Sequence, residues 1–333
     1  LDHAVLEPAN PPPRRLLPGV GELLAEWQTH ARPPYDGIRV AGAQWCRQCY
    51  ETKDFLARNH VPYRWLDIER DAPTRELVER LTGSLTRLPV VLFPDGSHLV
   101  APTRTELAAR AGLRTQAEAK VYDLVIVGGG PAGLADAVYG ASEGLSTLLI
   151  EQHAPGGQAG TSSRIENYLG FPAGVTGEDL ARRAIAQARR FGAELLTAQE
   201  VVGLRREDPY RVVELADGSE VRSYAVLLAT GLAVTTLDVP GIERLLGAGV
   251  YYGAATTEAA IYRDRDVCIV GGANSAGQGA VFFARTARHV TMLIRSTGLE
   301  TSMSQYLIDR IAALPNIAVV PRVEVREARG RDH

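Results

Sequence analysis

A glycine-rich turn between a strand pattern and a helix pattern constrains the fold of this chain more than any other feature. The turn consists of Gly128, Gly129, Gly130, Pro131, Ala132 and Gly133. An apolar stretch over 122–127 leads into it and a helix pattern over 132–142 leads out. Gly128 permits the tight bend, Gly130 lets the backbone approach a diphosphate, and Gly133 lets the helix pack on the strand. Amide groups at the helix start then bind the phosphate charge.

An acidic residue follows the turn at the distance that a dinucleotide site requires. A second apolar strand over 147–150 ends at Glu151, which lies 18 residues after Gly133. A carboxylate at this place can bind a ribose hydroxyl. The combination of strand, turn, helix, strand and acid therefore predicts dinucleotide binding. The alternative is a glycine turn in an unrelated α/β domain.

Length and composition limit the class of protein. With 333 residues the chain has room for two to three domains, and 45% hydrophobic with 23% charged residues is a globular balance. A net charge of −3 predicts no nucleic-acid partner. The most apolar stretch, 121–150, is broken by charged residues and glycines, and no secretory start is present, so we expect no membrane span and a cytoplasmic location. Three cysteines are too few for a disulfide framework.

A second glycine turn repeats the first with two changes. It follows a strand pattern over 267–270 and consists of Gly271, Gly272, Ala273, Asn274, Ser275 and Ala276. The partner strand, 290–294, ends in Arg295 where an acid would indicate NAD, and arginine suits the 2′-phosphate of NADP. Ala273 stands where the second glycine belongs, and its methyl group would crowd a diphosphate. The pattern predicts NADPH binding, and the alternative is a fold retained without its ligand.

A pair of cysteines indicates redox chemistry near the start of the chain. Cys46 and Cys49 lie between a strand pattern and a helix pattern, and Pro89 follows about 40 residues later. This arrangement is typical of a thioredoxin-like dithiol. Cys46 at the helix start would be the exposed thiolate, and Cys49 would resolve the mixed disulfide. Pro89 is expected to be cis and to face the pair. The alternatives for Cys46 and Cys49 are half of a zinc site and two unreactive thiols. The third cysteine, Cys268, is expected to lie in the core.

The pattern of elements divides the chain into four segments. Residues 1–36 are rich in proline, contain one short helix pattern over 20–30 and read as a linker. We expect a thioredoxin-like or glutaredoxin-like domain over 37–115. A dinucleotide-binding domain over 116–240 and an incomplete second one over 241–333 follow. The predicted fold class is α/β, with two Rossmann-like units of the ββα type after the thioredoxin-like domain.

From about Val121 onward the chain resembles the low-molecular-weight thioredoxin reductases, which are flavoproteins with one FAD domain and one NADPH domain. The matching segments are 126–133, Gly156-Gly157-Gln158, Ile165-Glu166-Asn167-Tyr168 and Leu228-Ala229-Thr230-Gly231. The resemblance implies that Gly157, Gln158 and Asn167 contact the flavin and that Ala229, Thr230 and Gly231 pass close to it. It also implies a homodimer. The dithiol domain ahead of this core is similar to the arrangement in the flavoprotein subunit of alkyl hydroperoxide reductase.

The chain departs from the thioredoxin reductases in two ways. Those proteins carry a dithiol just before the second glycine turn, whereas this chain has Gly253 and Thr256 in the cysteine positions. The chain also stops before the family's final FAD segment, so we expect a C-terminal truncation. The overall likeness is to bacterial reductases fused to an upstream receiver or cyclic-nucleotide domain, which predicts such a regulatory domain before residue 1.

Three functions are compatible with these features. In the first, electrons pass from NADPH through FAD to a disulfide, with Cys46–Cys49 as the nearest acceptor and a disulfide-bearing protein or small redox acceptor as partner. In the second, the flavin reduces a ferredoxin-like protein or a quinone. In the third, the protein is a flavin-binding redox sensor whose catalysis has decayed.

Overall fold

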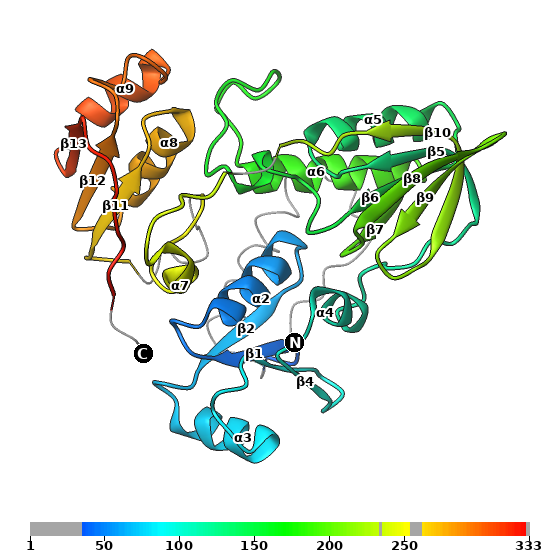
Figure 1. Cartoon of the computed structure of the whole chain (residues 1–333), viewed down its shortest axis with the longest axis horizontal. Helices are drawn as coiled ribbons and strands as arrows, with labels where there is room; N and C mark the ends of the chain where they lie inside the picture. The colour runs from blue at the N-terminus through cyan, green and yellow to red at the C-terminus, as the bar shows by residue number, and fades with distance from the viewer. Residues whose placement is uncertain (1–34, 233–234, 254–261, 331–333) are drawn as a thin grey trace, which may run out of the picture.

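Three β-sheets organise the chain, and they follow one another in sequence (Figure 1). The computed structural model describes residues 35–232, 235–253 and 262–330. The helix predicted over 20–30, and nearly all of the predicted linker, lie outside the described residues. Each sheet has its own hydrophobic core and its own covering helices.

The first sheet belongs to a thioredoxin-like unit and has the strand order β2-β1-β3-β4. Strand β1 is parallel to β2 and antiparallel to β3, which is antiparallel to β4. Val40 and Val91 point into a core with Phe55 and Leu56 of helix α2. The elements are β1 (Ile38–Gly42), α2 (Arg47–Arg58), β2 (Tyr63–Asp67), α3 (Ala72–Thr82), β3 (Val90–Leu92), β4 (His98–Val100) and α4 (Arg104–Arg110).

The second sheet has six strands in the order β7-β6-β5-β10-β9-β8 and forms a Rossmann-type unit, here called the first nucleotide unit. Strands β7, β6, β5 and β10 are parallel to one another. Strand β9 pairs antiparallel with β10 on one side and with β8 on the other. The elements are β5 (Val121–Val127), α5 (Pro131–Ser142), β6 (Thr147–Glu151), the 3-10 turn η2 (Ala159–Thr161), α6 (Gly177–Arg190), β7 (Glu194–Thr197), β8 (Val201–Glu207), β9 (Tyr210–Leu215) and β10 (Glu220–Leu228).

Alternation of side chains along β5 gives this sheet two cores. Ile126 faces helices α5 and α6, where it packs with Leu134 and Ile185. Val125 and Val127 face the other side and join a cluster with residues of β9 and β10. Successive side chains of a strand point to opposite faces, so one apolar run fills both cores.

The third sheet has the order β11-β12-β13 with all strands parallel and forms the second nucleotide unit. Its elements are α7 (Ile242–Leu245, before the sheet), β11 (Asp266–Val270), α8 (Asn274–Phe283), β12 (His289–Ile294), α9 (Gln305–Ala312) and β13 (Ile317–Pro321). Val267 and Ile269 pack with α8 and α9. The expectation that Cys268 lies in the core was wrong: it is exposed, because it points to the opposite face of β11.

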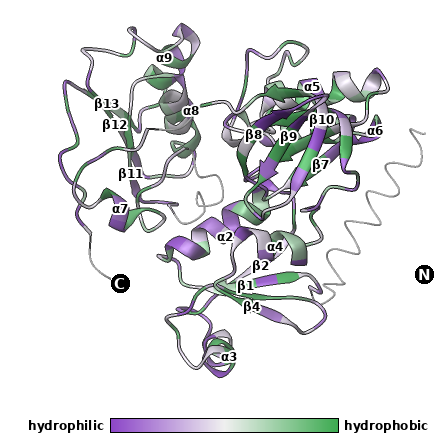
Figure 2. Cartoon of the chain, turned by 45° about the vertical axis from the view of Figure 1, so that its right-hand side comes forward, coloured by the Kyte–Doolittle hydropathy of each residue, from purple (hydrophilic) through white to green (hydrophobic). Residues whose placement is uncertain are grey.

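Helix α2 lies between the two nucleotide units (Figures 1 and 2). Near its C-terminal end the Arg58 guanidinium donates a hydrogen bond to the backbone oxygen of Gly157 at 3.2 Å. Near its N-terminal half Tyr50 stacks edge-on with Tyr251, with ring centroids 5.0 Å apart. Helix α2 is coloured mostly hydrophilic in Figure 2. It nevertheless contacts other parts of the protein near both of its ends.

Candidate functional site

The first glycine turn has the geometry that the sequence predicts. Gly128 has φ +108°, a left-handed conformation that L side chains rarely adopt, and a methyl group there would overlap the carbonyl oxygen of Ala229. A methyl group at Gly133 would overlap the carbonyl oxygen of Gly128. Helix α5 begins within this motif, at Pro131, with Gly130 as its N-cap. The turn therefore presents the amide groups of a helix start, as anion binding requires.

Glu151 lies buried against the turn and bonds to its backbone. Its side chain is buried, and one carboxylate oxygen accepts a hydrogen bond from the Gly129 amide at 2.7 Å. The other oxygen accepts a hydrogen bond from the His153 amide at 2.8 Å. An ionised carboxylate has about four acceptor positions, so two bonds leave capacity for a ribose hydroxyl.

Two of the other segments predicted to contact a flavin meet at the turn. The nearest heavy atom to a methyl group placed on Gly130 would be the Cα of Gly157, 4.0 Å away, so space is open beside Gly130. The Ala229 backbone lies against Gly128, and its amide continues the ladder by donating to the Val127 oxygen at 2.8 Å. The exposed residues are Pro131 and Ala132 of the turn and, in the other two segments, Gln158, Leu228, Thr230 and Gly231.

Asn167 lies in the loop between η2 and α6 of the first nucleotide unit. It is exposed, and its neighbour Glu166 forms an ion pair with Arg310 of α9 at 3.1 Å. Within the described residues, Asn167 forms no hydrogen bond with the glycine turn. Its predicted role toward the flavin therefore stays a prediction.

The two cysteines form a dithiol at the start of α2. Cys46 is the N-cap, and its sulfur accepts a hydrogen bond from the Cys49 amide at 3.1 Å. Hydrogen bonding from the Cys49 side chain, and then from the Cys49 and Gln48 amides, lowers the pKa of Cys46 to about 7. Cys49 is fully buried, and its hydrogen bond to Cys46 together with burial raises its pKa. Cys46 is thus suited to attack and Cys49 to resolve.

The predicted cis peptide bond before Pro89 is confirmed. Leu88 belongs to the same core cluster as Cys49, with Cys46 packed against that cluster. Strand β3 begins at Val90, directly after this proline, because Pro89 has no amide hydrogen to donate to a ladder.

Lys53 is a neighbour of the dithiol that the sequence analysis did not single out. It is almost completely buried, and its ammonium lies over the Trp65 ring, 4.6 Å from the centroid. Its positive charge contributes to the lowered pKa of Cys46. The helical spacing of four residues from Cys49 places it on the same face of α2, and this spacing was the signal that could have identified it.

The second glycine turn also opens a helix. Gly271 has φ +131°, and Ala273 is the N-cap of α8. Asn274 is engaged inside the unit, since its side-chain amide donates to Ser304 at 3.0 Å and its oxygen accepts from the Ser304 amide. Ser275 is exposed, Ala276 is half-buried, and Arg295 is exposed after β12. Nucleotide binding by these residues stays a prediction.

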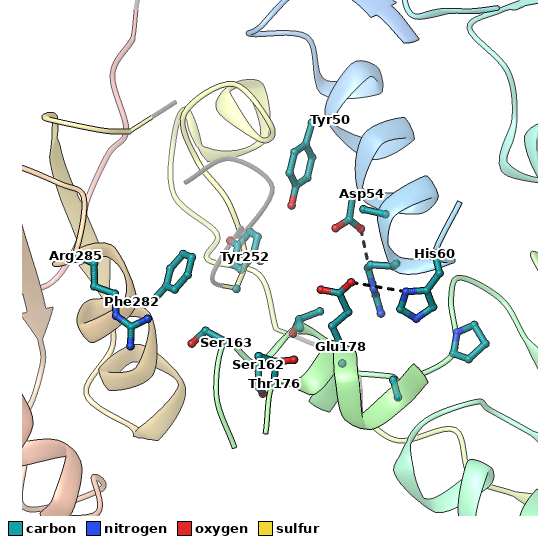
Figure 3. A pocket seen from close by; sticks show the side chains of 17 residues that line it. Tyr50, Asp54, His60, Ser162, Ser163, Thr176, Glu178, Tyr252, Phe282 and Arg285 are labelled. Carbon is teal, nitrogen blue, oxygen red and sulfur yellow. Dashed lines mark ion pairs between the residues drawn. The ribbon is translucent and has the colours of Figure 1, made fainter. Parts of the chain in front are cut away.

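One cavity of about 320 Å³ is lined by all three units (Figure 3). Tyr50 and His60 reach it from the thioredoxin-like unit, and His60 lies 3.8 Å from Glu178 at the start of α6. Phe282 of α8 lines the opposite side, together with Tyr252 from the connecting segment. The small residue Gly253 also lines this space.

Other classes of site receive no support from the described part of the chain. No helix over these residues is long and apolar enough to span a bilayer. No group of three or more potential metal-ligating side chains occurs over the same ranges.

Comparisons with known proteins agree with this architecture. The model of the pyridine nucleotide-disulphide oxidoreductase family matches residues 122–333, and the glutaredoxin model matches residues 38–99. The chain belongs to the pyridine nucleotide-disulphide oxidoreductases. Its amino-terminal unit is thioredoxin-like, as the strand order of the first sheet shows.

Individual relatives carry related names. The thioredoxin reductase of Mycolicibacterium smegmatis is 37% identical over 210 residues, which cover 63% of this chain and 66% of that protein. The bifunctional thioredoxin reductase/thioredoxin of Mycobacterium leprae is 38% identical over 175 residues, which cover 53% of this chain and 38% of that protein. The chain thus spans less than two thirds of the length of these curated relatives.

Solved structures show the same fold. The thioredoxin reductase of Lactococcus lactis aligns with a TM-score of 0.59 and 29% identity, covering 63% of this chain and 68% of that one. The thioredoxin reductase of T. acidophilum aligns with a TM-score of 0.60 and 26% identity, covering 64% and 68%.

Proposed function

We propose that this protein is an FAD-dependent oxidoreductase of the thioredoxin-disulfide reductase type, which passes electrons from NADPH through FAD to a disulfide. The observation that carries the proposal is the cavity lined by all three units. The dithiol helix, the segment after Gly157 and helix α8 of the second nucleotide unit meet there. The family match to the pyridine nucleotide-disulphide oxidoreductases supports the same reaction class.

The first nucleotide unit fits FAD. Gly130 offers open space beside the amides of the α5 start, and Glu151 lies buried beneath the turn. These residues would hold the diphosphate and a ribose of the cofactor. FAD, when bound, supplies two-electron transfer between a nicotinamide and a disulfide.

Cys46 and Cys49 are the proposed acceptor. Two electrons and two protons convert their disulfide to two thiols, while NADPH and a proton supply them and NADP is released. The reduced pair would then act on a disulfide-bearing protein or a small disulfide. Attack by the Cys46 thiolate breaks the substrate disulfide, forms a mixed disulfide with one half and releases the other half as a thiol. Cys49 then attacks the Cys46 sulfur, which re-forms the Cys46–Cys49 disulfide and releases the second half as a thiol. The low pKa of Cys46 favours this order of events.

The test uses the full chain loaded with FAD. This protein is titrated with NADPH under anaerobic conditions. We expect the visible flavin band to bleach and two additional thiols to appear. The matched control is the Cys46→Ser/Cys49→Ser double variant, whose flavin should bleach without a gain of thiols. A wild-type protein that retains no flavin would contradict the cofactor assignment.

A second function is favoured by the position of the dithiol along α2. Cys46 lies at one end of this helix and Arg58, which contacts Gly157, at the other, about 18 Å away at 1.5 Å per residue. In this arrangement the dithiol is far from the Gly157 end. A flavin that reduces a ferredoxin-like protein or a quinone directly is therefore the alternative, and bleaching without new thiols in the wild type would support it.

The remaining sequence expectations stay predictions. These are the cytoplasmic location, the homodimer, the upstream regulatory domain and the domain boundaries at 36, 115 and 240. A decayed redox sensor would show tight FAD binding with slow oxidation of NADPH, which the same titration measures.

A further inference from the structure

A second cavity, of about 310 Å³, lies between the thioredoxin-like unit and the first nucleotide unit. This volume is at the lower end of the roughly 300–1,000 Å³ that ligand pockets occupy. The side chains that matter for its chemistry are Arg104, Thr105, Gln152, His153, Glu200 and Asp217. The first two come from α4 of the thioredoxin-like unit, and the others come from the first nucleotide unit.

The cavity lies beyond the carboxyl ends of strands β6 and β7. Gln152 and His153 directly follow Glu151, the acid at the end of β6, and Glu200 follows the parallel neighbour β7. Ligands of open α/β sheets bind in the crevice beyond the carboxyl ends of such strands. With the diphosphate at the glycine turn and a ribose at Glu151, the adenine would extend toward this cavity.

The thioredoxin-like unit is fixed against this crevice by hydrogen bonds. The Asn59 side chain donates to the backbone oxygen of His153 at 3.2 Å, and the Thr105 hydroxyl donates to the backbone oxygen of Ala198 at 3.4 Å. The amide of Thr197 donates to the backbone oxygen of Arg114 at 2.9 Å. These bonds hold α4 at the mouth of the cavity.

Arg104 has the chemistry to bind a purine there. Its side chain is exposed, and its guanidinium forms no hydrogen bond or ion pair with the described residues. Arg104 and His153 both line the cavity, and burial, followed by the positive charge of Arg104, lowers the pKa of His153. A planar guanidinium stacks on aromatic faces, and the carboxylates of Glu200 and Asp217 can accept from an amino group.

We propose that Arg104 binds the adenosine half of the FAD, so that the thioredoxin-like unit forms one wall of the cofactor site. The proposal rests on the proposed function, because it assumes that the first nucleotide unit binds FAD. It also couples FAD binding to the association of the thioredoxin-like unit with the first nucleotide unit, because a ligand that contacts both units stabilises their association.

The experiment measures FAD affinity of the full-length apoprotein from the fluorescence of the flavin. We expect Arg104→Ala to raise the Kd roughly three- to tenfold through loss of the stacked cation. Arg104→Lys should lie between wild type and Arg104→Ala, since it keeps the charge and loses the planar group. The matched control is Arg80→Ala, which removes an exposed arginine from α3 of the same unit.

The outcomes separate this proposal from the proposed function. FAD binding by wild type with an unchanged Kd for Arg104→Ala would overturn the role of Arg104 and leave the function intact. Failure of the wild type to bind FAD would overturn the function and this proposal together. An unchanged thermal midpoint of the Arg104→Ala apoprotein shows that its folding is intact.

Discussion

Arg58 at the C-terminal end of α2 donates a hydrogen bond to the backbone oxygen of Gly157, which lies 99 residues further along the chain. Gly157 in turn lies against Gly130 of the glycine turn. The helix that carries the dithiol is therefore joined directly to the segment that we propose holds the cofactor.

We predict that Arg58→Ala loosens this junction. Loss of one hydrogen bond costs about 1 kcal/mol, which corresponds to roughly a fivefold larger population of separated units. Hydrogen exchange should accelerate over residues 153–160 and remain unchanged in α3. Arg80→Ala is the control, and equal exchange in both variants would show that Arg58 does not hold the units together.

Cys46 should be alkylated with a half-maximal rate near pH 7, since its pKa is lowered to about 7. Below that pH the thiol keeps its proton and reacts slowly; above it the thiolate reacts. Cys49 should remain unmodified in the folded reduced protein because it is buried and its pKa is raised. Mass spectrometry of iodoacetamide-treated protein from pH 5 to 9 measures both cysteines.

The same lowered pKa predicts the direction of a stability change. The folded pKa of Cys46 lies below the reference value of 9.0, so ionisation stabilises the folded reduced protein at high pH. This contribution is present above pH 9 and is lost as the pH falls through 7. Urea midpoints of wild type and Cys46→Ser should therefore diverge between pH 7 and 9, and parallel curves would argue against a depressed pKa.

Gly130→Ala should impair FAD binding without harming the apoprotein. Gly130 has φ −71°, which alanine adopts readily, and its nearest neighbour would be 4.0 Å from the new methyl group. The methyl group would, however, stand where the diphosphate approaches, and we expect roughly a tenfold or greater loss of affinity. Flavin fluorescence gives the affinity, and the apoprotein thermal midpoint serves as the folding control. Full affinity in this variant would place the diphosphate elsewhere.

Arg295 should decide the choice between the two nicotinamide cofactors. Its exposed guanidinium follows β12, where a 2′-phosphate would lie. We expect Arg295→Ala to raise the Kd for NADPH roughly tenfold, the scale of a hydrogen bond to a charged group, and to leave that for NADH unchanged. Titration of both cofactors measures the difference. A parallel loss for both would indicate a structural role.

Local patterns predicted much of the site, because they determine local geometry. The tight turn requires a left-handed conformation at Gly128, which glycine adopts without a steric penalty, and the spacing of Cys46 and Cys49 places them on one helical turn. The cis bond before Pro89 followed from the same resemblance to a thioredoxin-like dithiol.

Contacts between units could not be predicted in this way. The residues next to Arg58 and Arg104 in the sequence do not indicate which distant residues they face. Arg58 contacts Gly157, and Arg104 lines a cavity with Glu200, each almost a hundred positions away. Cys268 was misplaced for a related reason. An apolar strand pattern does not reveal which of its two faces another element covers, and in the described structure the face that carries Cys268 is left bare.

The span of α2 has a mechanical consequence. A helix held by hydrogen bonds cannot shorten, so the distance between its ends is fixed while the helix persists. Cys46 can approach Gly157 only if the whole thioredoxin-like unit moves as a rigid body. If Cys46 and Cys49 accept the electrons, as we propose, the rate of that movement sets an upper limit on the rate of turnover.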